Sequence, residues 1–70
     1  MLTMDYRLVD VLNADQLEIE DLIGLGEDVV KILFITPTKI GFDLLIENEY
    51  GEKDTIEIAD DEQFELFILE

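Results

Sequence analysis

Two β-strand patterns separated by a proline lie within residues 27–47, EDVVKILFITPTKIGFDLLIE. The first, residues 27–36, is rich in branched side chains and is apolar on both alternating positions, as in a strand that is covered on both faces. Pro37 ends this run, because proline has no amide donor and restricts the residue before it. In the second run, Phe42, Leu44 and Ile46 alternate with mostly acidic residues, which predicts a strand with one wet face. An all-β fold is therefore expected.

Further strand patterns flank this pair. Residues 17–23 alternate apolar and acidic side chains, and two glycines at positions 24 and 26 then favour a tight reversal. Gly51 marks a hairpin, after which residues 55–58 and 64–69 have the pattern of two more short strands. Residues 5–12 have two interpretations, because Val9 and Val11 favour an extended chain whereas Thr3 is a candidate helix cap. We expect a strand there, with a helix as the alternative.

Five short strands within residues 17–69 predict an antiparallel meander, and curling into a small half-open barrel hides most of the edges of such a sheet. The layout begins with a leading element that contains Leu17, Asp21 and Leu22. A long strand, two hairpins and a short closing strand follow it. It resembles Src-homology-3-like barrels, and the resemblance implies an architecture for residues 17–69 but no functional residues. Glu20 stands where such barrels often have a glycine before the aspartate.

The whole chain, residues 1–70, is short enough that we expect a single acidic β domain. Residues 17–69 form the barrel in this interpretation, and residues 1–16 pack on it as a strand or a helix. The alternative fold class is α+β with that N-terminal helix.

Charge excludes several classes of partner. The 70 residues include 19 Asp and Glu against 4 Lys and Arg, a formal net charge of −15. Such a surface repels phosphates, so we expect no direct binding to nucleic acid or to an anionic membrane. The hydrophobic fraction of 49% is too high for a disordered polyanion. Without cysteine or a long apolar run, we expect a cytoplasmic protein, in the host cytoplasm if the gene is carried by a phage.

The residue inventory also argues against catalysis. His, Cys, Ser and Trp are all absent from the sequence, so no common nucleophilic triad can be assembled. The two glycines at positions 24 and 26 lack the third glycine of a dinucleotide fingerprint, and the acids at 60–62 lack the spacing of a calcium loop. We therefore expect a protein that is not an enzyme and that has no cofactor or metal.

Acidic residues at alternate or near-alternate positions form the candidate partner-binding face. On a strand, such carboxylates stand roughly 6.7 Å apart, which approximates every second phosphate of a DNA strand at about 3.4 Å each. The predicted set is Glu18, Glu20, Glu47, Glu49, Glu52 and Asp54. Two alternatives stay open, because a solubilising surface and a halophilic adaptation would give the same composition.

Apolar residues at outward-facing positions form a second candidate surface. If Phe64, Leu66 and Ile68 fill the barrel, the intervening side chains of that strand point away from it. The predicted self-association set is Leu33, Ile35, Leu45, Phe67 and Leu69. An exposed apolar patch of this kind predicts a homodimer through the Phe67 face, unless residues 1–16 cover it.

Three classes of function follow. The first is an inhibitory module whose acidic face docks on a basic protein, for example a nucleic-acid-binding one, and imitates nucleic acid as small phage-encoded inhibitors and anti-defence proteins often do. The second is a structural or assembly module that associates through its apolar face. The third is a small-ligand or cation-binding protein, which the scarcity of pocket volume disfavours.

Overall fold

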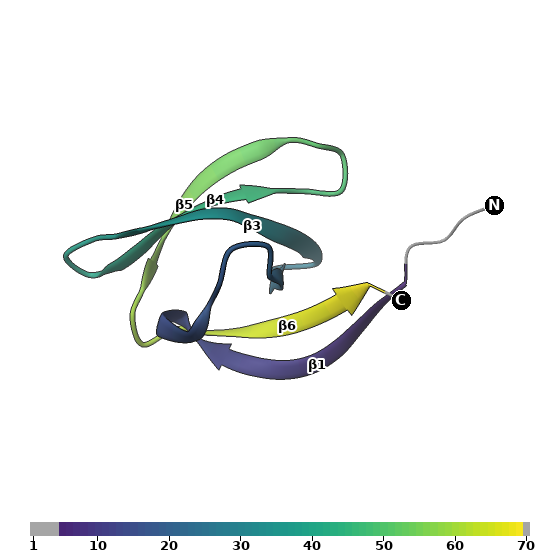
Figure 1. Cartoon of the computed structure of the whole chain (residues 1–70), viewed down its shortest axis with the longest axis horizontal. Coiled ribbons are helices and arrows are strands. Elements are labelled where there is room, and N and C mark those ends of the chain that lie inside the picture. The colour runs from purple at the N-terminus through teal and green to yellow at the C-terminus, as the bar shows by residue number, and fades with distance from the viewer. Residues whose placement is uncertain (1–4, 70) are drawn as a thin grey trace.

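Six antiparallel strands make up most of the described chain. Figure 1 shows the computed structural model, which describes residues 5–69. The strands are β1 (Tyr6–Asn13), β2 (Leu22–Leu25), β3 (Asp28–Pro37), β4 (Gly41–Glu47), β5 (Lys53–Ala59) and β6 (Gln63–Leu69), and a short 3₁₀ turn, η1 (Ala14–Gln16), follows β1. The all-β expectation is confirmed.

The six strands form one open sheet in the order β1-β6-β2-β3-β4-β5. Its edges are β1 and β5. The first and last strands of the chain lie side by side, β6 also pairs with β2, and consecutive hairpins join β2 to β5. In Figure 1 the sheet curls, with the β1–β6 pair on one side and β3, β4 and β5 on the other. This curl agrees with a small barrel-like domain.

The core lies inside this curl and is built from alternate strand positions. Ile23, Ile32 and Leu44 are fully buried there, on three adjacent strands. η1 and its flanking residues close one end, because Ala14 and Leu17 are also buried and the Ala14 N–H donates to the Glu62 carbonyl at 2.9 Å. The buried set comprises Ala14, Leu17, Ile23, Val30, Ile32, Leu44, Ile46, Ile58 and Phe64.

A β-bulge in β3 changes which side chains face this core. Ile32 pairs with Ile46, but Phe34 pairs with Leu45, so Leu33 is the extra residue. The shift turns Ile35 toward the core and leaves Phe34 57% exposed on the opposite face. The sequence prediction that placed Ile35 outward is therefore wrong, because simple alternation does not hold across a bulge.

The N-terminal segment is a strand over Tyr6–Asn13, so the α+β alternative with a helix there is wrong for the described residues. β1 joins the edge of the sheet beside β6 and does not fold across its face. Thr3, the candidate cap of that helix, lies outside the described residues.

The leading element of the barrel begins later than the sequence predicts. Residues 17–21 are loop and turn, and β2 starts only at Leu22. Gly24 lies within β2, and the reversal to β3 falls at Gly26, whose φ is +64°. The alternation of residues 17–20 was misleading because Leu17 is buried beside η1 rather than on a strand.

Candidate functional site

A groove lies on the sheet face that points away from the core. Leu22 pairs with Lys31, and Lys31 pairs with Glu47. Each end of this row is next in sequence to a buried residue, Ile23 or Ile46, so the row faces away from the core. The end of β6 and the start of β1 border the same groove, through Leu69 and Tyr6. Its volume is about 310 Å³, and it is lined by Tyr6, Glu20, Leu22, Val29, Lys31, Glu47, Asn48, Glu49 and Leu69. We call these residues the acidic groove.

Apolar side chains line much of the groove, and charged ones surround them. Leu22, Val29 and Leu69 come from three different strands, and the Tyr6 side chain adds an aromatic surface. Leu69, the last residue of β6, is 52% exposed. The groove therefore offers both hydrophobic contact and charge to a bound group.

The three carboxylates of the acidic groove come from two parts of the chain, the segment before β2 and the end of β4 with its turn. Glu20 precedes β2, Glu47 ends β4, and Glu49 lies in the β4–β5 turn. With Lys31 they carry a formal charge of −3 + 1 = −2. Glu47 is compensated further, because it pairs across the sheet with Lys31 and Lys53 and lies 3.9 Å from the Lys53 ammonium. Within residues 5–69, Glu20 and Glu49 have no ion pair, so they are the groove's uncompensated acids.

Glu20 is held by a local distortion of the backbone. Its N–H donates to the Ile32 carbonyl at 2.7 Å, and the Ile32 N–H donates to the Asp21 carbonyl at 2.9 Å. Two residues thus face one, the hydrogen bonding of a β-bulge, and Glu20 has a φ of +78°. This is the position at which the sequence resemblance leads one to expect glycine, and a glutamate occupies it.

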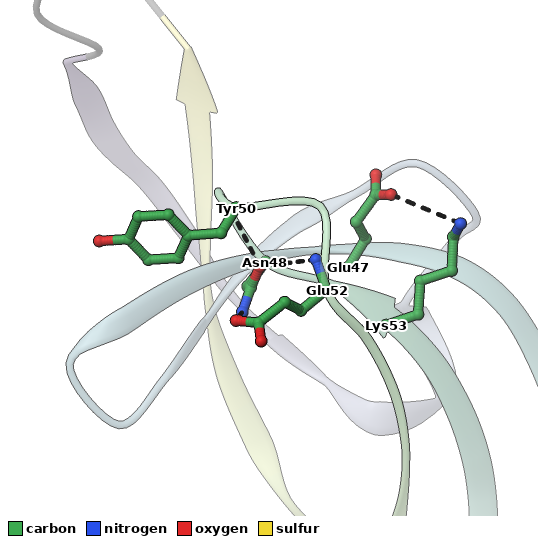
Figure 2. A network of polar contacts seen from close by, with 5 residues as sticks. All are labelled: Glu47, Asn48, Tyr50, Glu52 and Lys53. Atoms are coloured by element: carbon green, nitrogen blue, oxygen red, sulfur yellow. Dashed lines mark hydrogen bonds and ion pairs between the residues drawn. The ribbon is translucent and has the colours of Figure 1, made fainter.

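Glu49 is positioned by a hydrogen-bonded turn centred on Asn48 (Figure 2). The Asn48 Oδ1 accepts from the Tyr50 N–H at 2.9 Å and from the Glu52 N–H at 3.0 Å. Its Nδ2 donates to the Glu52 carboxylate at 3.0 Å, and Gly51 supplies the positive φ of +80° that the turn requires. Both the oxygen and the nitrogen of the Asn48 side-chain amide therefore take part in shaping the turn, and Glu52 is bound to it.

Tyr50 projects from the tip of the same turn and is 86% exposed (Figure 2). A second, smaller hollow of about 50 Å³ lies beside it, lined by Asp28, Val29, Asn48, Glu49 and Tyr50. Because Val29, Asn48 and Glu49 line both hollows, Tyr50 borders the acidic groove. An aromatic ring this exposed is available to a partner.

The pKa of the Tyr6 hydroxyl is shifted by its surroundings in the groove. Burial disfavours its ionised form and raises the pKa of Tyr6 above the ordinary value of 10.0, and the negative charge of Glu49 raises this pKa further. The phenol is therefore neutral at physiological pH and serves the groove as an uncharged aromatic side chain.

The structure brings together only part of the predicted acidic set. Glu20, Glu47 and Glu49 line one groove, whereas Glu18, Glu52 and Asp54 do not. Glu18 and Glu20 lie on a loop, so the strand spacing expected for them is wrong. Asp54 pairs with Ile46 and so lies on the face opposite Glu47. The single row of carboxylates predicted from these residues is not present.

The predicted apolar set is also divided. Leu45 and Phe67 are half-buried on the outer face, and the Phe67 ring lies against Gly24, where an added Cβ would be 3.1 Å from Cε2. Leu69 lines the acidic groove, Ile35 faces the core and Leu33 is the bulged residue. Sequence reasoning missed five groove residues, since only the strand order β1-β6-β2-β3-β4 brings them together. They are Tyr6, Leu22, Val29, Lys31 and Asn48.

No family model, curated protein or solved structure matches the chain. Among residues 5–69, no group of three or more carboxylates is arranged to hold a metal ion. The only helical segment described there, η1, has three residues, so that part of the chain contains no helix able to cross a bilayer.

Proposed function

We propose that the chain is a non-catalytic acidic binding module that docks on a basic protein surface and occludes it. The observation that carries this proposal is the pair Glu20 and Glu49, two acids without an ion pair among residues 5–69 that border one groove. They lie on a chain whose formal net charge is −15. Such a charge steers a positively charged partner toward the groove and speeds its association.

The distribution of charge supports the same function. None of the acidic side chains in residues 5–69 is buried, so the charges act on the solvent and on an approaching partner. A net charge of magnitude roughly 2 to 8 already serves the solubility of a small domain, and the excess here adds self-repulsion. The finer proposal is that the partner normally binds nucleic acid and that the chain imitates its phosphates, as an inhibitor of phage or anti-defence type would.

Charge reversal tests this proposal against a basic partner captured from the native cell. The double variant Glu20→Lys with Glu49→Lys should lower the affinity at least about tenfold, since like charges facing each other cost several kcal/mol. The matched control is Asp15→Lys with Asp61→Lys, which changes the net charge equally at exposed positions in η1 and the β5–β6 turn. Binding should also weaken in salt and be competed by DNA or heparin. Affinity that is insensitive to salt and polyanions contradicts the proposal.

The open edge at β1 favours a second candidate, assembly through an apolar surface on the Phe67 side. Leu8 pairs with Phe67, and Leu8, Val9 and Val11 are all exposed on this edge strand. An exposed strand edge with apolar side chains is a template for pairing with another chain. In this case Leu8→Asp abolishes association, polyanions do nothing, and sedimentation gives the mass of a homodimer that the variant loses.

A further inference from the structure

We infer that the acidic groove accommodates one arginine side chain of the basic partner, with its alkyl part against the apolar lining and its guanidinium between Glu20 and Glu49. This inference rests on the proposed function and names the chemical group that the groove selects. It is argued from volume, charge and aromatic surface in turn.

The size of the groove fits a single extended side chain. Its volume of about 310 Å³ is at the lower end of the roughly 300–1,000 Å³ found for small-molecule sites, so it is too small for a folded segment. The apolar lining formed by Leu22, Val29 and Leu69 suits an alkyl stem. Long cationic side chains bury such stems against apolar surface while their charged heads stay at the rim.

The charges of the groove are complementary to a cation. Lys31 repels a bound cation, but the three carboxylates give the groove a formal charge of −2 even with Lys31 included. Glu47 already lies 3.9 Å from the Lys53 ammonium and is the cross-strand neighbour of Lys31, so Glu20 and Glu49 are the acceptors that remain. A guanidinium presents five donors in a planar fork and can engage two carboxylates, which the compact ammonium of lysine does less well.

Aromatic surface further favours arginine. Tyr6 lines the groove and stays un-ionised, and Tyr50 lines the smaller hollow that shares Val29, Asn48 and Glu49 with the groove. Guanidinium groups stack on tyrosine rings, and they lose less hydration than ammonium groups when they do so. Tyr50 is 86% exposed, so its ring is accessible to a guanidinium that approaches from solvent.

A peptide titration tests the inference without an identified partner. The probe is a Gly-Gly-Arg-Gly-Gly peptide with blocked ends, whose only charge is the guanidinium. It is titrated into the labelled 70-residue chain and followed by nuclear magnetic resonance. A single side chain should bind with a dissociation constant on the order of 1 mM. Signals of Tyr6, Leu22 and Val29 should move together. The citrulline peptide, which has the same shape without the charge, should move them much less, and the lysine peptide should fall between.

Variants of groove residues should change this affinity in both directions. Glu49→Gln and Glu20→Asn should each weaken arginine binding about two- to fivefold, the effect of one exposed ion pair. Asparagine is chosen at position 20 because it tolerates a positive φ. Lys31→Gln should tighten binding by a similar factor, since it removes the groove's own cation. Asp61→Asn, an equal change of net charge at an exposed turn, should leave the affinity unchanged.

Three results would overturn the inference. They are arginine-induced shifts spread over carboxylates throughout the chain, equal binding of the citrulline peptide, and equal weakening by Asp61→Asn and by the groove variants. Its failure is distinguishable from failure of the proposed function. A basic partner whose salt-sensitive binding is unaffected by Glu20→Asn and Glu49→Gln would leave the docking proposal standing and remove the groove as the place where arginine binds.

Discussion

Glu20 combines an unfavourable backbone conformation with a place at the groove. A non-glycine residue with positive φ costs on the order of 1 kcal/mol and persists only where its surroundings hold it. Here the backbone hydrogen bonds of Glu20 and Asp21 to Ile32 stabilise the positive φ of Glu20. Glycine would relieve the strain but would remove a carboxylate from the acidic groove. The residue at this position therefore agrees with a binding role better than with a purely structural one.

Tyr6 allows a direct measurement of the electrostatics of the groove. In a Tyr50→Phe variant Tyr6 is the only tyrosine, because the chain contains 2. Its pKa should lie above 10.0, since burial and then the charge of Glu49 both disfavour the phenolate. Because the folded chain holds this proton more tightly than the unfolded chain, stability from this group is complete below about pH 10 and is lost as the pH rises through the higher folded value.

Phenolate absorbance measured against pH checks this prediction. Adding Glu49→Gln to the Tyr50→Phe variant should lower the Tyr6 pKa toward its ordinary value, whereas Asp61→Asn should not. An unchanged titration midpoint after Glu49→Gln would show that Glu49 and the Tyr6 ring do not share the groove.

At the scale of elements, the start of β4 depends on the absence of a side chain. Gly41 pairs with Ala59, and a Cβ built on Gly41 would lie 2.7 Å from the Asp60 nitrogen and closer still to the Ile58 carbonyl oxygen. Backbone atoms cannot move aside as a flexible side chain does. Gly41→Ala should therefore destabilise the protein by about 1–3 kcal/mol, the usual range for overpacking.

Denaturant unfolding measures this cost, and the neighbouring residue supplies the control. Ile40 is exposed, so Ile40→Ala should change the free energy of unfolding by about 0.5 kcal/mol or less. If Gly41→Ala proved as mild as Ile40→Ala, the close approach of β4 to the end of β5 would be wrong.

The sequence predicted strands well and their irregularities poorly. Alternation identified β4 to β6 within a few residues, because each has one buried face. β3 was identified by its run of branched apolar residues, but the burial expected on both of its faces is wrong, because Phe34 is 57% exposed on the outer face. It failed at Leu33 and at residues 17–21, where bulges and turns depend on tertiary hydrogen bonds that no local pattern records. The acidic groove could be predicted only in part, because Tyr6, Leu22 and Leu69 are far apart in the sequence and meet through strand order.

The molecule as a whole balances a small core against a large surface charge. A domain of this size buries only about 60% of the surface that its unfolded chain exposes, so its stability margin is narrow. None of the acids within residues 5–69 is buried, and few basic residues are present to offset them. Repulsion between these charges is therefore significant against that narrow stability margin.

Salt should consequently stabilise the fold. Raising sodium chloride from 0.01 to 0.15 M shortens the screening length from about 30 to about 8 Å, which weakens repulsion between neighbouring carboxylates. A gain on the order of 1 kcal/mol corresponds to a rise in Tm of about 4–8 °C for a domain of this size. Thermal unfolding followed by circular dichroism measures the shift.

A triple variant, Asp15→Asn with Asp61→Asn and Glu62→Gln, changes only exposed acids outside the groove. It should have a higher Tm at low salt and a smaller response of Tm to added salt. If Tm did not depend on salt in either protein, the charges would be too dispersed to act together, and the long-range steering that the docking proposal needs would be absent.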